Sequence, residues 1–149
     1  GQVRFTSILL GVERILLALP NEHTMNLPIS TEEYPPIDLS LFRKEPFILL
    51  NEDQLLRKMA DSLCAQSGFV PQVTMECRSM ETAYAMTRVG VGITFLTEQF
   101  VKNGTDGKST RFYTLKNIPA QRSIAAIYRN DRYLPQAAQC LISLLQSKI

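Results

Sequence analysis

The sequence lacks the charge and cysteine patterns that would point to nucleic acid or to a metal. Its 149 residues carry a formal net charge of only +2, and Lys and Arg are scattered among Asp and Glu instead of forming a basic stripe. We therefore expect this segment not to bind DNA by itself. The cysteines Cys64, Cys77 and Cys140 form no C-x-x-C pair and have a single histidine, His23, as a partner, which argues against a zinc site. Reduced, mostly buried thiols of a cytoplasmic protein are expected.

Long apolar runs are also absent. The longest aliphatic stretches, residues 8–10 and 15–19, are short, whereas a membrane-spanning helix needs roughly 20 apolar residues. The first residues contain no apolar segment that leads to a small-residue cleavage site, so no secretory signal is predicted. We expect no association with a membrane.

Catalytic patterns are missing as well. His23 lies in a proline-rich connector, and no Ser or Cys nucleophile stands at a recognisable elbow. The paired carboxylates Glu32 and Glu33 are sequence neighbours on that connector, which is typical of a solvated surface. The G-V-G at residues 90–92 lacks the third glycine of a phosphate loop and precedes a strand. We therefore predict no enzyme, no metal and no cofactor.

The apolar pattern that is present predicts an α/β fold. Aliphatic and β-branched runs alternate with segments whose apolar residues recur at helical spacing. The hydrophobic content of 45% is enough for the core of one ordinary domain. The predicted strands are residues 12–19, 47–50, 73–77, 93–96, 111–115 and 123–129, the predicted helices are 39–44, 52–67, 79–89 and 134–148, and 103–109 is a predicted loop.

Capping residues mark where the helices begin and end. Asn51 is a candidate N-cap of helix 52–67, with Gly68 as its stop. Asp38 and Ser79 are the corresponding caps of helices 39–44 and 79–89. The last helix carries one apolar stripe along its length, formed by Leu134, Ala138, Leu141, Leu145 and Ile149.

Three segments in this order resemble the effector-binding domain of LysR-type transcriptional regulators. They are LLALPNEH at residues 16–23, EPFILL at 45–50 and RSMETAYAMTRVGVGITFL at 78–96. The resemblance implies a type 2 periplasmic-binding-protein-like fold, of which this chain supplies the second lobe and the carboxyl-terminal part of the first. It assigns residues 1–19 to a crossover strand, 20–121 to the second α/β lobe, and 122–149 to a return strand and terminal helix of the first lobe.

The resemblance also implies the partners of the protein. A small-molecule effector binds between the two lobes, and DNA is contacted only through an N-terminal helix-turn-helix that this chain does not contain. The domain is expected to form homo-oligomers through helix 52–67 and strand 73–77, and its terminal helix is expected to cover the sheet of the first lobe. Two positions depart from the family pattern, since Thr24 and Thr97 stand where proline is usual.

Candidate effector residues follow two strands. In α/β sheets ligands collect beyond the carboxyl ends of strands, where helix N-termini present free N–H groups. The residues after strand 47–50 either bind an effector or cap their own helix, and those on strand 93–96 either lie along the cleft floor or pack in the core. The acidic pair at 52–53 favours a polar or cationic ligand over a bare anion. The candidates are Asn51, Glu52, Asp53, Gln54, Thr94 and Phe95.

The sequence thus predicts a sensing domain of a bacterial LysR-type transcriptional regulator that is located in the cytoplasm. Effector binding between the lobes would change the spacing of DNA-binding heads in an oligomer. The alternative is a solute-binding protein of a transport system, which shares the two-lobed fold. An upstream helix-turn-helix would favour the regulator, and an upstream signal peptide would favour the solute-binding protein.

Overall fold

The computed structural model describes residues 3–25, 27, 30–129 and 136–148 and divides the chain into two compact units. The larger unit is Arg14–Ala120, and the smaller combines Gly1–Glu13 with Gln121–Ile149. Strand β1 (Phe5–Pro20) contributes to both units.

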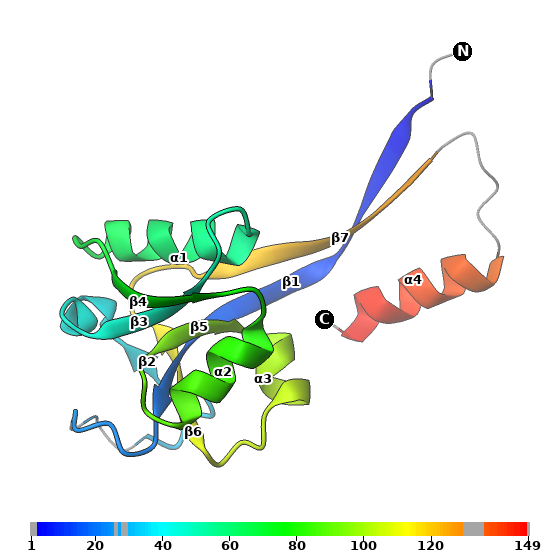
Figure 1. Ribbon diagram of the computed structural model, residues 1–149. Helices are drawn as coiled ribbons and strands as arrows, with labels where there is room; N and C mark the ends of the chain where they lie inside the picture. The colour runs from blue at the N-terminus through cyan, green and yellow to red at the C-terminus, as the bar shows by residue number, and fades with distance from the viewer. Residues whose placement is uncertain (1–2, 26, 28–29, 130–135, 149) are drawn as a thin grey trace. The chain divides into compact units, whose positions relative to one another are not determined.

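The larger unit is organised around a mixed sheet with the strand order β2-β6-β1-β5 (Figure 1). Strand β1 pairs antiparallel with both β5 (Thr94–Thr97) and β6 (Thr110–Leu115), and β2 (Pro36–Ile37) adds to β6 in parallel. Residues 15–19 of β1 are fully buried, because Ile15, Leu17 and Leu19 belong to one hydrophobic cluster and Leu16 and Ala18 to another. This position explains their continuous aliphatic sequence, because a strand covered on both faces has no alternation of polar residues.

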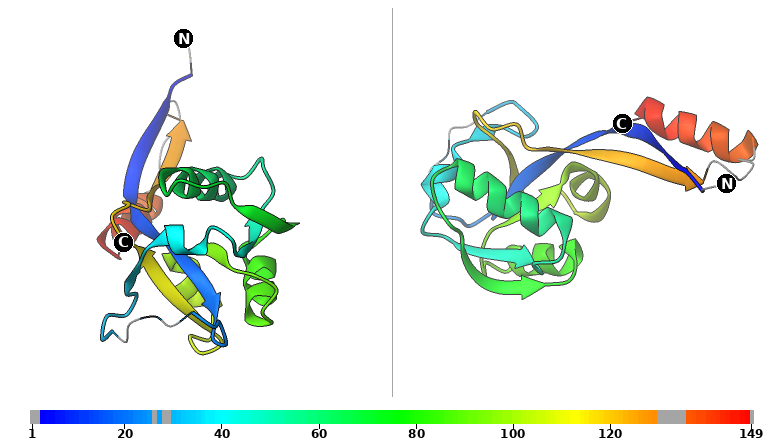
Figure 2. Two further views of the ribbon diagram at one scale, coloured as in Figure 1. Left: turned by 90° about the vertical axis from the view of Figure 1, so that its left-hand side faces the viewer. Right: turned by 90° about the horizontal axis from the view of Figure 1, so that it is seen from above.

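A second sheet in this unit consists of two parallel strands, β3 (Pro46–Leu50) and β4 (Gln72–Cys77). Helices α1 (Leu55–Gln66) and α2 (Met80–Arg88) lie on opposite sides of this pair, as Figures 1 and 2 show. Each helix follows one of the two strands directly, which is the strand–helix alternation that the sequence predicts.

The segment that leads into β5 runs alongside β3. Phe47 and Ile93 form a parallel bridge, and the Ile93 N–H donates to the Pro46 carbonyl at 2.9 Å. Gly92 permits this close approach, because a Cβ atom at that position would lie 2.6 Å from the Pro46 carbonyl oxygen. The glycine is therefore needed for its lack of a side chain.

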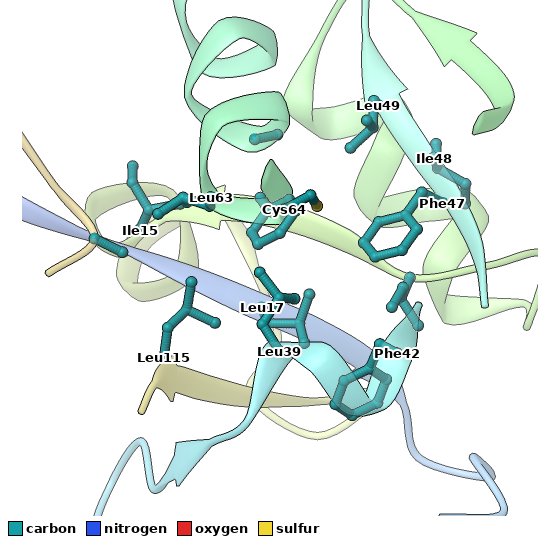
Figure 3. Close-up of a cluster of buried hydrophobic side chains, with 14 of the residues drawn as sticks. Ile15, Leu17, Leu39, Phe42, Phe47, Ile48, Leu49, Leu63, Cys64 and Leu115 are labelled. Carbon is teal, nitrogen blue, oxygen red and sulfur yellow. The ribbon is translucent and has the colours of Figure 1, made fainter. Parts of the chain in front are cut away.

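The main core of the larger unit is formed by aliphatic and aromatic side chains from both sheets. Figure 3 shows Leu17, Phe47 and Cys64 meeting in this cluster, from β1, β3 and α1 respectively. Phe47 also stacks on Phe95 with their ring centroids 5.9 Å apart. A smaller cluster around Leu16 and Leu96 lies against α2 and helix α3 (Glu98–Gly104).

The expected start of the first long helix is wrong by one turn. Helix α1 begins at Leu55 and not at Glu52, and its N-cap is Gln54, whose side chain makes no cap bond. Asn51 therefore does not cap the helix. Its N–H donates to the Cys77 carbonyl, which extends the β3–β4 ladder and keeps residue 51 out of the helix.

The other capping predictions are confirmed. Asp38 accepts a hydrogen bond from the Ser40 N–H, although it begins a 3-10 helix, Leu39–Phe42, that is shorter than expected. Ser79 accepts from the Thr82 N–H and begins α2, which ends before Gly90. The expected loop 103–109 starts slightly too early, because α3 extends to Gly104.

The smaller unit contains strand β7 (Gln121–Arg129), which pairs with β1, and helix α4 (Gln136–Lys148). Within it, the guanidinium of Arg122 donates to the carboxylate of Glu13 at 2.5 Å. Strand β1 begins earlier than the aliphatic pattern predicts, since its pairing with β7 orders residues that alternate in exposure.

The apolar stripe predicted for the last helix is only partly described. Leu134 and Ile149 lie outside the described residues, whereas Leu141 and Leu145 are 56% and 40% exposed on α4. Cys140 on the same helix is also exposed, whereas Cys64 and Cys77 are buried as expected. Of the described stripe residues, Leu141 and Leu145 are therefore exposed and Ala138 is half-buried.

Candidate functional site

One edge of the larger unit brings together the carboxyl ends of three strands. Strands β3 and β4 are parallel, and the segment entering β5 runs parallel to β3. Each strand is followed by a helix, so α1, α2 and α3 all begin at this edge. Such an arrangement is the usual location of ligands in α/β folds, because helix N-termini present N–H groups and a positive dipole. We call it the helix-start edge.

The three helix starts differ in how their first N–H groups are satisfied. Ser79 caps α2, and Thr97 caps α3 by accepting from the Phe100 N–H at 3.3 Å. Gln54 precedes α1 in an extended conformation without a side-chain cap bond. The first turn of α1 therefore keeps donors that a ligand can use.

Three hydrogen bonds fix the turn Asn51–Gln54, two to residues 77 and 78 at the end of β4 and one within the turn. The Asn51 N–H donates to the Cys77 carbonyl, and the Gln54 N–H donates to the Asn51 carbonyl at 3.0 Å. The Gln54 side chain donates to the Arg78 carbonyl at 2.7 Å. Asn51 and Gln54 are half-buried, whereas Glu52 and Asp53 are exposed. The backbone of the turn is thus fixed while its acidic side chains face solvent.

Arg57 lies beneath this turn and is a residue that the sequence reasoning missed. The residue is 7% exposed, and its guanidinium donates to the Leu50 carbonyl at 2.9 Å, where β3 ends. It also pairs with Asp61 and Glu76, both at 3.2 Å. Asp61 follows Arg57 at helical i,i+4 spacing, which is a signal available in the sequence. Arg57 therefore connects α1, β3 and β4.

The remaining candidate residues, Thr94 and Phe95, lie in the core beneath the edge. Thr94 is 2% exposed, and its hydroxyl donates to the Ile48 carbonyl at 2.5 Å. Phe95 is equally buried against Phe47. The structure therefore groups Asn51, Glu52, Asp53 and Gln54 in one surface turn and places Thr94 and Phe95 apart from it, inside the unit.

An ion pair fixes the start of α3 at the same edge. The Arg14 guanidinium donates to both carboxylate oxygens of Glu98, with the shorter distance 2.7 Å, and Lys102 lies 3.4 Å away. The hydrogen bond from Arg14 lowers the pKa of Glu98 to about 2. Glu98 is thus ionised at neutral pH, and the positive charges of Arg14 and Lys102 balance its negative charge.

Among the described residues the two buried thiols are not activated, and neither a group of metal ligands nor a membrane-spanning helix is found. Burial raises the pKa of the Cys64 thiol to about 12, which keeps it protonated. No three His, Cys, Asp or Glu residues among the described ones are grouped as metal ligands, and no described helix is long and apolar enough to cross a membrane. His23 accepts from the Met25 N–H and contacts Glu45 at 2.9 Å, so both ring nitrogens are engaged.

The strand order, the parallel pair and the helix-start edge define a lobe of the type 2 periplasmic-binding-protein-like class. The family model described as the LysR substrate binding domain matches residues 2–149. The chain belongs to this family. The predicted fold class is thereby confirmed.

Its relatives include proteins named as transcriptional regulators. The uncharacterised HTH-type regulator YcgK of Bacillus subtilis is 25% identical over 149 residues, which cover 92% of this chain and 45% of YcgK. The HTH-type regulator XapR of Escherichia coli is 28% identical over 143 residues, which cover 95% of this chain and 45% of XapR. The chain thus spans about half the length of these curated relatives.

The fold is shared with a solved domain that carries a ligand. The regulatory domain of CcmR from Synechocystis PCC6803, in complex with 2-PG, superposes with a TM-score of 0.76 at 14% identity. The match covers 99% of this chain and 68% of that one. At this identity the likeness shows the fold.

Proposed function

We propose that this chain is the effector-sensing part of a bacterial LysR-type transcriptional regulator and binds a small molecule at the helix-start edge. The observation that carries the proposal is the meeting of three helix N-termini at one edge in a chain of this family. Because the first turn of α1 has no side-chain cap, its N–H groups are available to an effector. The solute-binding alternative is not favoured, since the matched relatives are named as regulators.

The turn Asn51–Gln54 supplies the proposed contacts. Asn51 and Gln54 offer amide groups, while Glu52 and Asp53 add negative charge that favours a polar or cationic effector. Glu52 lies 4.0 Å from the Arg57 guanidinium, which neutralises part of that charge. In this proposal Thr94 and Phe95 support the turn from below through β5 and do not touch the ligand.

The chain acts by binding, not by catalysis. The hydrogen bonds of His23 and the raised pKa of Cys64 support a non-enzymatic role, because neither group is poised as a base or nucleophile. The whole protein would work in the cytoplasm as a homo-oligomer and contact DNA through a helix-turn-helix outside these residues. The exposed face of α1 and strand β4 would form the oligomer contact.

A matched pair of glutamines, one just before α1 and one at its end, tests the proposal. In cells carrying the full-length gene and a reporter promoter, polar metabolites are screened for one that changes transcription. Gln54→Ala at the start of α1 is expected to remove this response, while Gln66→Ala at its end keeps it, because only Gln54 lies at the helix-start edge. Equal responses of the two variants would contradict the assignment.

A further inference from the structure

A cavity in the larger unit shares no residue with the turn Asn51–Gln54. It has a volume of about 740 Å³ and opens between the end of α3, the first residues of β6 and the segment before β2. Strand β2 pairs with β6 only at Thr114 and Leu115, so the edge of β6 at residues 110–113 is not covered by that strand. The wall includes the aromatic rings of Tyr34, Phe112 and Tyr113.

Two neighbouring residues that line this cavity, Thr110 and Arg111, each carry a buried polar atom without a partner among the described residues. Thr110 is 4% exposed, and its hydroxyl makes no hydrogen bond to any group that the structure describes. The same holds for the Nε–H of Arg111, the next residue along β6. A buried donor without a partner costs about 1 to 3 kcal/mol, so these atoms are rare in folded proteins and indicate a site for an added acceptor.

The charges around the cavity are separated. Arg111 donates through Nη2 to the His23 carbonyl, and among the described residues no carboxylate lies within 4 Å of its guanidinium. Glu32 and Glu33 are exposed carboxylates on the same cavity, likewise without a described cation within that distance. The other charged side chains that line the cavity already have partners. Lys102 pairs with Glu98. Asp106 pairs with Arg88 and accepts hydrogen bonds from the backbone of the loop before β6.

We propose that this cavity binds a small zwitterion of the α-amino acid type with an apolar side chain. Its carboxylate would accept from the Thr110 hydroxyl and the Arg111 Nε–H, and its ammonium group would face Glu32 and Glu33. Its side chain would lie against the aromatic wall. A simple anion is disfavoured by the two glutamates, and a simple cation leaves the two buried donors unpaired. The site is independent of the effector site proposed above.

Three related compounds test this arrangement by isothermal titration calorimetry on the full-length protein. L-Leucine carries both charges, 3-methylbutylamine keeps only the amine, and 4-methylpentanoate keeps only the carboxylate. Only L-leucine is expected to bind saturably, with hydrogen–deuterium exchange slowed at residues 30–34 and 110–113. The proposal would be overturned if 3-methylbutylamine or 4-methylpentanoate bound as tightly as L-leucine. It would also be overturned if L-leucine gave no saturable heat, which would mean that the cavity holds water only.

Two threonines on β6 provide a matched control. Thr110→Val removes the unpartnered hydroxyl and should weaken leucine binding about tenfold or more without lowering the melting temperature of the free protein. Thr114→Val removes a hydroxyl that donates to the Tyr34 carbonyl, so it should lower the melting temperature and keep leucine binding. Gln54→Ala should also keep it, which separates this site from the effector site. The reverse pattern in the two threonine variants would refute the assignment.

Discussion

Replacing Arg57 by methionine is expected to destabilise the protein by about 2 to 3 kcal/mol, although methionine keeps most of the aliphatic volume. The bond from the guanidinium to the Leu50 carbonyl is worth about 1.5 to 3 kcal/mol, because its donor is charged and the contact is buried. The carboxylates of Asp61 and Glu76 are each 47% exposed, so water solvates them when the arginine is gone, and each pair adds only about 0 to 1 kcal/mol.

Urea unfolding followed by circular dichroism measures this change in the free energy of unfolding. Glu76→Gln and Asp61→Asn should each cost less than about 1 kcal/mol, because each removes one half-exposed pair. Arg43→Met, at an exposed arginine, should stay within about 0.5 kcal/mol of the parent. If Arg57→Met costs no more than Arg43→Met, the buried bond to Leu50 is not what holds the start of α1 against β3.

In the same urea assay, Gly92→Ala should lower the free energy of unfolding by about 2 kcal/mol or more, because the added Cβ would lie 2.6 Å from a backbone carbonyl oxygen. Gly107→Ala should lower it by only about 1 kcal/mol, because that position has open space and only its φ of 68° is unfavourable for alanine. Equal costs would contradict the close approach. Glu98→Gln should lower the free energy of unfolding by about 1 kcal/mol at neutral pH, because it removes the ion pair with Arg14. The lowered pKa of Glu98 makes this contribution full above pH 4.5 and lost as the pH falls toward 2, so the stabilities of the two proteins should converge over that interval. Persistence of the difference at pH 2 would refute the ion-pair explanation. Iodoacetamide should label exposed Cys140 in the native protein and spare Cys64 until it unfolds, as peptide mass spectrometry can check; early labelling of Cys64 would contradict its burial.

Local signals in the sequence were sufficient where a bond closes within a few residues. Ser79 caps α2 through the Thr82 N–H, and Asp38 caps the 3-10 helix through the Ser40 N–H, both as predicted. The same type of signal at Asn51 failed. There a bond to Cys77, distant in sequence, holds the residue in the strand ladder and delays the helix until Leu55.

The candidate site could be predicted only in part for the same reason. The order of strands and helices located the turn Asn51–Gln54 at a strand end, which the structure confirms. The helical spacing of Arg57 and Asp61 was visible, but the bonds from Arg57 to Leu50 and Glu76 depend on how β3 and β4 pair. The burial of Thr94 likewise follows from a contact with Ile48 that lies 46 residues away.

Hydrogen–deuterium exchange on the full-length protein, with and without a metabolite that changes transcription, tests the central claim most directly. The account predicts slower exchange in the turn Asn51–Gln54 and in the first turns of α1, α2 and α3, because the effector is held by these helix starts. Unchanged exchange at all of these amides, with protection confined to other surfaces of the chain, would contradict it.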